Sequence, residues 1–381
     1  MTQALSGGLY TRLSAYYFHF YAVLGLMLPF FGLWMAERGL SAAQIGAVLA
    51  AHGLTRIVLP PLWAAWADAS GKRLVIIQWA SLACAMGLLL LPLAHSFWTV
   101  LGAVLLFSVF WNATMPQFEA YTLGQLAQRG GDYSRIRLWG SVGFVLAVVG
   151  GGAAFDYWDL QPLPLAMALL VVGMTIAARG LPADHCVPRS VVQGSIFSTL
   201  RRPVVLALLG ACMLHQFSFA PYYGFFSLYL EQQGWGKTST GLLWAFGVIC
   251  EIVMFIWTGS LIRRFGLRRI FLFAMLTTVA RWSLLEWTVQ WLPGLLLLQA
   301  LHLSSFGLYH AAGVQLIHRE FEAHQRGRGQ ALYVSLSFGV GGSLGSAAAG
   351  GLWDWAGPDW AYRMAAMAAV GASLLAWRWV R

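Results

Sequence analysis

Long apolar runs of about twenty residues follow one another through almost the whole chain. A helix of about 20 residues is long enough to cross a hydrocarbon core of about 30 Å. Short segments of alternating polarity, which are typical of a membrane-spanning β-barrel, are absent from the sequence. The pattern therefore predicts an all-α polytopic membrane protein. We expect roughly twelve spans, near residues 13–35, 42–67, 73–93, 97–122, 134–155, 162–180, 203–230, 238–262, 267–288, 291–317, 328–352 and 359–378.

Composition leads to the same class of protein. The chain of 381 residues is 59% hydrophobic and only 10% charged. Soluble domains carry about 25% charged residues, so this chain lacks the charge to cover a surface that faces water. The composition therefore excludes a soluble globular protein.

The formal net charge of +10 could indicate a nucleic-acid partner, but the positions of the charges along the chain indicate a membrane topology instead. If both termini lie in the cytoplasm, most of the 24 Lys and Arg residues fall on the cytoplasmic side. Only Arg38, Lys237 and Arg363 fall outside. This asymmetry follows the positive-inside rule of membrane proteins. The charge therefore indicates topology, and we expect no nucleic acid to bind.

No motif in the sequence indicates an enzyme or a metal site. The four cysteines show no paired spacing, and three of them lie within predicted spans. The sequence contains no H-E-x-x-H, no G-x-S-x-G and no phosphate-binding glycine loop in a suitable context. We therefore expect no catalytic residue, no bound metal and no cofactor.

An acid and a base mark the stretch from Trp111 to Phe144. Glu119 lies on the otherwise apolar fourth span, and Arg137 lies at the start of the fifth. Ionised side chains are costly at membrane depth, so they usually face a cavity and pair with one another. If the two spans are antiparallel neighbours, Glu119 and Arg137 meet near the bundle axis and form a site for a polar solute.

Two further polar groups lie in the first two spans. Arg56 lies deep in the second span, four residues after His52 and on the same helix face. It either lines the substrate site or forms a structural pair with an acid elsewhere. His19, on the aromatic-rich first span, is a candidate lining residue together with Tyr16, although packed aromatic residues would explain that span equally well.

A charged turn occurs twice, six spans apart. In both copies small and charged residues hold matching positions, which predicts an internal repeat of two six-helix halves. The turn residues are Asp68, Gly71, Lys72 and Arg73 in the first copy and Gly259, Gly266, Arg268 and Arg269 in the second. We therefore expect an N-terminal bundle of residues 1–180, a cytoplasmic loop of 181–202 and a C-terminal bundle of 203–381.

The second half supplies more ionisable groups within spans. Glu251 and Arg281 form a candidate pair on the eighth and ninth spans. His302 and His310 on the tenth span are eight residues apart and therefore share a helix face. Each histidine is either a hydrogen-bonded packing residue or part of a functional site with that pair.

Twelve spans, two halves and the repeated turn resemble the major facilitator superfamily. Within it, W-N-A-T-M-P-Q-F-E-A-Y and S-R-I-R-L-W-G-S-V-G-F resemble the lactose permease-like branch, and A-L-H-L-S-S-F-G-L-Y-H-A-A is most similar to the phenylpropionate permease family. The resemblance implies substrate contacts at Glu119, Arg137 and Phe144, with Asn112 in the same run. It also places Arg281 and His302 in a proton-coupling group.

The sequence departs from the sugar carriers of that branch at several positions. Ser305 and Gln299 stand where the lactose permease pattern has an acid and a lysine, and Phe144 stands where it has tryptophan. These departures disfavour a galactoside, whereas Arg56, Arg137 and Arg281 favour an organic anion such as an aromatic carboxylate.

The resemblance implies a proton-coupled importer that works by alternating access in a bacterial inner membrane. Burial disfavours the charged form of a carboxyl group, so Glu251 is the expected proton carrier, and His302 or His310 is an alternative. A sugar or nucleoside symporter is the second hypothesis. A channel agrees less well with the paired charges, and a membrane-embedded enzyme would need a catalytic motif, which the sequence lacks. The expected partners are a small-molecule substrate, protons and the lipid bilayer, and we expect the chain to act as a monomer.

Overall fold

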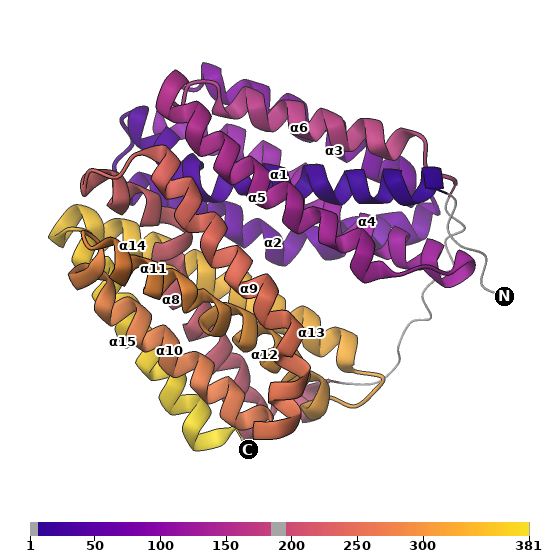
Figure 1. Cartoon of the computed structure of the whole chain (residues 1–381). Helices are drawn as coiled ribbons and strands as arrows, with labels where there is room; N and C mark the ends of the chain where they lie inside the picture. Colours follow the sequence, from indigo (N-terminus) through magenta and orange to yellow (C-terminus); the bar gives the residue numbers. More distant parts are fainter. Residues whose placement is uncertain (1–6, 184–195, 381) are drawn as a thin grey trace. The chain divides into compact units, whose positions relative to one another are not determined.

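The computed structural model describes residues 7–183 and 196–380, and every regular element in these ranges is helical (Figure 1). Contacts within the chain divide it into two compact units. The first unit contains Met1–Leu40 and Thr55–Ser190, and the second contains Ser41–Leu54 and Val191–Arg381. Residues 184–195, which make up most of the predicted cytoplasmic loop, lie outside the described residues.

The first unit is a bundle in which α1 packs against α5 and α6, and α3 packs against α4 and α6. Its elements are α1 (Gly7–Glu37), the part of α2 (Ala42–Ser70) that begins at Thr55, α3 (Arg73–Leu90), the short 3-10 turn η1 (Leu91–Leu93), α4 (Phe97–Arg129), α5 (Tyr133–Trp158) and α6 (Leu163–Arg179).

The second unit is built around α8, which packs against α14 and α15. It contains the first part of α2, up to Leu54. Its other elements, in chain order, are α7 (Phe197–Leu200), α8 (Pro203–Gln232), α9 (Lys237–Phe265), α10 (Leu267–Thr288), α11 (Leu292–Ala300), η2 (Leu303–Leu308), α12 (Tyr309–Glu320), α13 (Arg326–Val334), η3 (Ser335–Gly341), α14 (Gly342–Ala356) and α15 (Pro358–Trp379).

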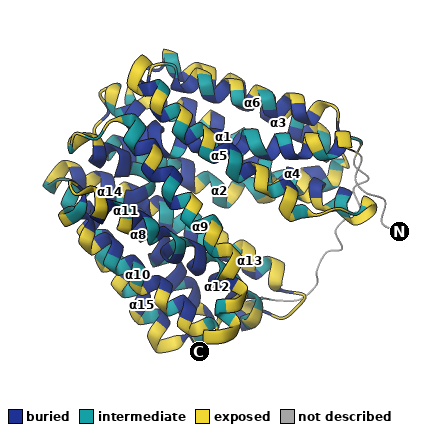
Figure 2. Cartoon of the chain, viewed as in Figure 1, coloured by how far each residue is buried: buried dark blue, intermediate teal, exposed yellow. Residues whose placement is uncertain are grey.

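The predicted all-α membrane fold is confirmed, and each of the twelve predicted spans coincides with a helical segment. Among the described residues, 10 helices are long and apolar enough to cross a membrane. The two remaining spans are α6, which has 17 residues, and α15, which has 22. Many large apolar side chains are exposed, including Leu93, Ile256 and Trp287, and exposed and buried residues alternate along the same helices (Figure 2). Such a surface is expected where a helix faces lipid.

The start of α2 groups with the second unit, although the sequence analysis assigned it to the first half. The backbone N–H groups of Ala42 and Ala43 donate to the carboxylate of Asp354 on α14, at 3.0 and 2.9 Å. The first N–H groups of a helix have no partner within the helix, so this carboxylate acts as their cap. Gly350 lies against the carbonyl of Ala42, which allows the two helices to approach closely. The predicted boundaries of the two halves stay a prediction.

Two segments of π-helix interrupt spans that the sequence predicted as continuous α-helices. One is η2, between α11 and α12, and the other is η3, between α13 and α14. Such wide turns are rare and occur often at functional sites. Because η2 lies between His302 and His310, it also changes the helical register that the sequence analysis assumed for these residues.

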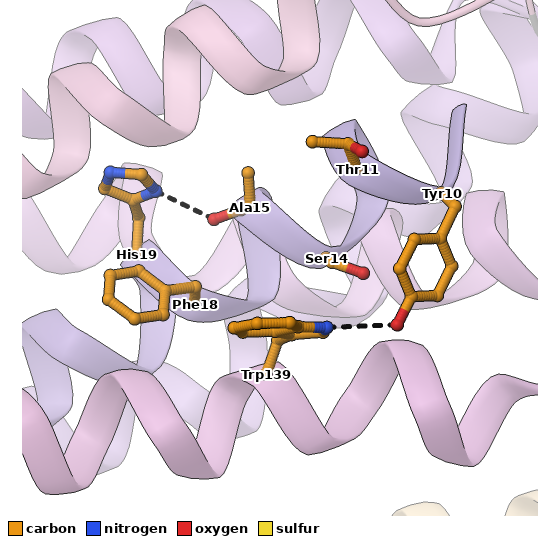
Figure 3. A pocket seen from close by; sticks show the side chains of 7 residues that line it. All are labelled: Tyr10, Thr11, Ser14, Ala15, Phe18, His19 and Trp139. Atoms are coloured by element: carbon orange, nitrogen blue, oxygen red, sulfur yellow. Dashed lines mark hydrogen bonds between the residues drawn. The ribbon is translucent and has the colours of Figure 1, made fainter. Parts of the chain in front are cut away.

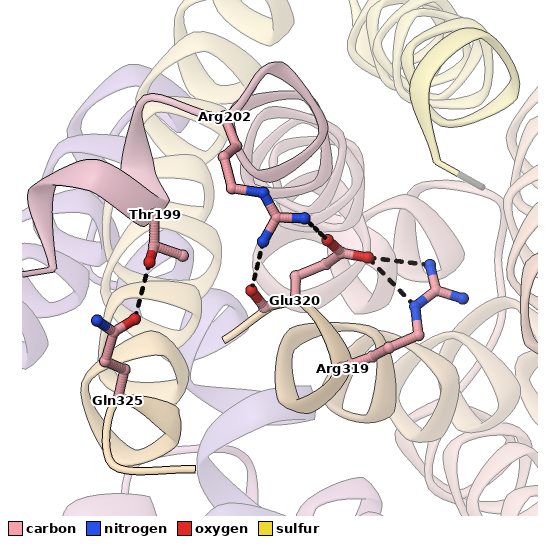
Figure 4. A network of polar contacts seen from close by, with 5 residues as sticks. All are labelled: Thr199, Arg202, Arg319, Glu320 and Gln325. Atoms are coloured by element: carbon pink, nitrogen blue, oxygen red, sulfur yellow. Dashed lines mark hydrogen bonds and ion pairs between the residues drawn. The ribbon is translucent and has the colours of Figure 1, made fainter. Parts of the chain in front are cut away.

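Short polar contacts hold Thr199 and Arg202, which follow shortly after residues 184–195, against the rest of the second unit (Figure 4). Thr199 on α7 donates to the side chain of Gln325 at 2.8 Å. Arg202 donates to the carboxylate of Glu320 at 2.6 Å, and that carboxylate also accepts from Arg319 at 3.2 Å. The start of α8 is thereby held against the turn between α12 and α13.

Gly143 allows α1 and α5 to pack closely, so Gly143→Ala is expected to destabilise the first unit. An added Cβ would collide with the backbone carbonyl of Phe18. Overpacking of this kind costs about 1–3 kcal/mol. The thermal midpoint of the detergent-purified protein should fall by a few degrees, as measured by tryptophan fluorescence. Gly150→Ala on the same helix is the control, because its added Cβ meets no atom within 4 Å; equal midpoints for the two variants would contradict the prediction.

Candidate functional site

An acid and a base from neighbouring helices lie half-buried in the first unit. Glu119 on α4 accepts a hydrogen bond of 2.5 Å from the hydroxyl of Tyr133, which begins α5. One turn later on α5, the guanidinium of Arg137 lies over the ring of Tyr21, 3.8 Å from its centroid. The ring of Tyr17 is also near, at 5.9 Å. The site thus combines a carboxylate, a guanidinium and three phenol rings.

The structure does not contain the direct ion pair that the sequence analysis expected between Glu119 and Arg137. Within residues 7–183 and 196–380, no carboxylate lies within 4 Å of the Arg137 guanidinium. The physical reason is that tyrosine rings occupy the space around both groups. Tyr133 takes the carboxylate as its acceptor, and its ring lies edge-on to that of Tyr17 with centroids 6.3 Å apart. Among the described residues, no acid side chain therefore forms an ion pair with Arg137.

Sequence reasoning missed the three tyrosines of this site. Tyr17 and Tyr21 are four residues apart on α1, and Tyr133 and Arg137 are four apart on α5. Residues at that spacing lie on one face of a helix. The spacing was a usable signal, but Tyr17 and Tyr21 lie in an aromatic-rich span where packing explains tyrosines equally well, and Tyr133 lies just before the predicted fifth span.

Three other predicted binding residues of the first unit lie in different surroundings. Asn112 is buried and donates to the hydroxyl of Thr55 at 2.9 Å and to the carbonyl of Ser108 at 2.7 Å. Phe144 is buried, and its backbone carbonyl lies against Gly25 of α1. Arg56 is half-buried on α2. The contacts of Asn112 and Phe144 are those of packing residues in the bundle.

The structure places His19 away from the tyrosines that surround Arg137. Its ring nitrogen Nδ1 bonds to the carbonyl of Ala15 at 2.8 Å, and it borders a hollow of about 250 Å³ together with Trp139 (Figure 3). Two residues along a helix correspond to a rotation of about 200°, so His19 and Tyr17 lie on opposite sides of α1. The expected role of His19 beside Glu119 and Arg137 is therefore not supported by its position.

The second unit contains a buried polar cluster around Arg281 of α10. This side chain is only 1% exposed. Its guanidinium donates to Gln299 at 2.7 Å, to Nδ1 of His302 at 2.9 Å and to the hydroxyl of Ser305 at 3.3 Å. The ring of Tyr222 lies below it, 4.4 Å from centroid to guanidinium carbon. None of these three hydrogen-bond partners is an acid.

Glu251 is linked to this cluster through His302 and does not pair directly with Arg281 as the sequence analysis expected. The Nε2 atom of His302 lies 3.4 Å from the Glu251 carboxylate. The imidazole ring separates the acid from the guanidinium because it offers one nitrogen to each. The result is a relay of three groups, in the order Glu251, His302 and Arg281.

The hydrogen bonds of His302 determine which of its nitrogens carries the proton. Arginine can only donate, so Nδ1 must accept through its lone pair. The proton of the neutral ring then lies on Nε2, which faces Glu251. A second proton on Nδ1 would oppose the N–H of Arg281 and break that hydrogen bond. In this arrangement Arg281 engages the lone pair of Nδ1, and the Nε2–H faces Glu251.

His302 and His310 are connected by a ring stack and not by direct contact. The ring of Phe306 lies parallel to both, with centroid separations of 5.3 Å to His302 and 6.0 Å to His310. The π-helix η2 places these three rings in one column. His310 also lies 3.4 Å from the hydroxyl of Tyr333, so it belongs to the side of the column farther from Arg281.

The two repeated turns make different contacts. Arg73 forms an ion pair of 2.6 Å with Asp68, and its Nε donates to Gln117 at 3.2 Å. In the second copy, Arg268 donates to the carbonyls of Val380 and Trp377, at the end of α15. Both turns need a glycine with positive φ: Gly71 and Gly266 in the respective copies, with φ of 63° and 83°. The three remaining residues are Lys72, which precedes α3, Gly259 on α9 and Arg269, which is exposed on α10.

Comparison with protein-family models gives a match over residues 10–364, to the family described as "MFS_1 like family". The chain belongs to this family. The expected membership of the major facilitator superfamily is thereby confirmed, and the chain is a transporter of that superfamily. It is a multi-pass membrane protein.

Two curated relatives illustrate the range of this family. The chain is 28% identical over 351 residues to the probable 3-phenylpropionic acid transporter of Escherichia coli (strain K12), and the aligned residues cover 90% of each chain. It is also 28% identical over 276 residues to the maltose permease of Geobacillus stearothermophilus, covering 70% of this chain and 68% of the permease.

Among solved structures, an aspartate-to-alanine mutant of the nucleoside transporter NupG has a TM-score of 0.88. The two share 15% sequence identity, and the match covers 98% of this chain and 100% of the other. At this identity the likeness concerns the fold alone.

Proposed function

We propose that this transporter is a proton-coupled symporter that imports a small organic anion, an aromatic carboxylate such as phenylpropionate, by alternating access. It acts in a bacterial inner membrane with both termini in the cytoplasm. The observation that carries the substrate class is Arg137, a half-buried guanidinium with no carboxylate within 4 Å among the described residues. An unneutralised cation in such a place attracts an anionic solute.

The rings around Arg137 support the aromatic part of this proposal. The half-buried ring of Tyr21 lies beside the guanidinium of Arg137, which offers a planar fork to a carboxylate. A solute with an aromatic ring and a carboxylate therefore matches the two kinds of surface that meet here. Glu119 accepts a hydrogen bond from the hydroxyl of Tyr133 and thereby orients that side chain.

The relay in the second unit supports proton coupling. Glu251 is the proposed proton carrier because His302 presents Nε2 to it, while Arg281 fixes the other ring nitrogen as an acceptor. Protonation of Glu251 weakens its attraction for the Nε2 proton, which leaves His302 held mainly by Arg281. Protons serve as the coupling ion, and no cofactor or metal is part of the proposal.

A sugar or nucleoside symporter is the second candidate. The maltose permease relative favours it. So does the hydrogen-bonding pair of Glu119 and Tyr133, since neutral hydroxylated solutes are bound by such groups. This candidate predicts that the Arg56→Gln variant transports a neutral substrate at the same rate as the unaltered protein.

The two candidates are distinguished by external pH, recorded while substrate is added to de-energised, lightly buffered cells that express the protein. Phenylpropionate, cinnamate, a β-galactoside and a nucleoside are compared. We expect alkalinisation with the aromatic acids alone, and its loss in a double variant with Glu119→Gln and Arg137→Ala. Alkalinisation with the sugar or the nucleoside would instead support the second candidate, and no response to any solute would contradict both.

A further inference from the structure

A hollow outside the candidate substrate site lies between α2, α3 and α4 of the first unit. Its volume is about 530 Å³, within the range of roughly 300–1,000 Å³ that ligand pockets occupy. Large aromatic side chains from all three helices line it, namely Trp63 and Trp66 from α2, Trp79 from α3 and Phe110 from α4. Two of the indoles, Trp66 and Trp79, are exposed.

Helical spacing explains why these residues form one wall. Trp63, Trp66 and Ser70 recur at intervals of three and four along α2, and Val75, Trp79 and Ala83 recur at intervals of four along α3. The two helices are antiparallel and are joined by the tight turn at Gly71. The indole of Trp63 is fixed by its hydrogen bond of 2.8 Å to the carbonyl of Val109 on α4. The hollow is therefore lined by one indole that a hydrogen bond holds in place and by two indoles that are exposed.

One end of the hollow carries a positive charge. Lys72 lines it at the turn, and in the described residues no carboxylate lies within 4 Å of its ammonium group. The nearest acid in the sequence, Asp68, is engaged by Arg73 at 2.6 Å. The N-terminal end of α3, which starts at Arg73, adds the positive end of a helix dipole beside Lys72. The other end of the hollow, at Ala83, is apolar.

We propose that this hollow binds one anionic phospholipid of the surrounding bilayer, with its phosphate at Lys72 and an acyl chain along the tryptophans. Charge complementarity commits the site to an anionic head group. The distance from Lys72 to Ala83 along α3 is about 16 Å at 1.5 Å per residue, which is about half of a 30 Å hydrocarbon core. The hollow thus matches one leaflet. Tryptophan, like tyrosine, is also enriched in membrane proteins at the level of the lipid head groups.

The test is native mass spectrometry of the full-length protein in detergent, titrated with dioleoyl phosphatidylglycerol or dioleoyl phosphatidylcholine. We expect tighter binding of phosphatidylglycerol, and a loss of about fivefold in its affinity in Lys72→Gln, because a lysine near an anionic lipid contributes about 1 kcal/mol. Arg129→Gln is the matched control, since Arg129 is an exposed cation of the same unit that does not line the hollow. It should leave the affinity unchanged.

Trp79→Ala provides a second variant, which should weaken the binding of both lipids by removing the apolar wall. Equal binding of the two lipids with no effect of Lys72→Gln would overturn the proposal. Equal losses in Lys72→Gln and Arg129→Gln would show attraction by net charge alone and would also overturn it. Displacement of the lipid by glycerol 3-phosphate at equal concentration would assign the site to a soluble phosphate ester instead.

Discussion

Glu251→Gln is expected to abolish uphill accumulation of the substrate while leaving exchange of internal for external substrate intact. Glutamine keeps the size of the side chain and its hydrogen-bonding capacity, but it cannot bind and release a proton. In the structure the carboxylate lies 3.4 Å from Nε2 of His302, whose other nitrogen accepts from Arg281. A permanently neutral group at this position would hold the relay in the state that follows protonation.

The measurement uses labelled substrate in membrane vesicles, once with an imposed proton gradient and once preloaded with unlabelled substrate. Exchange reports that the variant is folded and binds substrate, so the loss of accumulation alone identifies the coupling step. Glu231→Gln is the matched control, because Glu231 lies at the end of α8 and pairs with Lys237 at 3.5 Å. Accumulation by Glu251→Gln at the level of Glu231→Gln would contradict the assignment.

Arg137→Gln is expected to weaken the binding of an aromatic carboxylate by roughly 30- to 100-fold. Truncating one partner of a desolvated, hydrogen-bonded charge pair costs about 2–5 kcal/mol, and the half-buried position of Arg137 places it at the lower end of that range. The affinity of Arg137→Lys should lie between those of the unaltered protein and Arg137→Gln, since lysine keeps the charge but lacks the planar fork that holds a carboxylate with two hydrogen bonds.

The binding measurement is scintillation proximity or calorimetry on purified protein, which separates affinity from transport. Arg135→Gln is the matched control, because this residue lies two positions earlier on α5, is 80% exposed and pairs with Asp132. An equal loss in both variants would attribute the effect to surface charge, and an unchanged affinity in Arg137→Gln would remove this residue from the proposed site.

The two predictions address different units of the chain, so their outcomes are independent. Arg137 tests which solute is bound, whereas Glu251 tests what drives its movement. A neutral substrate that still requires Glu251 would retain proton coupling and replace the organic anion by the sugar or nucleoside of the second candidate.

Hydrophobicity along the chain determined the membrane class, because crossing a bilayer requires about twenty apolar residues whatever their neighbours are. The positions of the predicted spans follow from that requirement and agree with the helices. The same sequence also singled out Glu119, Arg137, Glu251, Arg281 and His302, since an ionisable side chain within an apolar run is costly and therefore conspicuous.

Only the tertiary structure decided which of these groups meet. Glu119 takes a hydrogen bond from Tyr133, and Arg137 lies over Tyr21, although both were expected to pair with each other. Spacing along one helix gives the face on which a residue lies, but it does not give the rotation of the neighbouring helix or the side chains that fill the space between them. The π-helix at Leu303–Leu308 shows the same limit, because its wide turn changes the register by which His302, Phe306 and His310 align. The sequence by itself therefore determined the class of the protein and its candidate charges, and the packing of helices decided their partners.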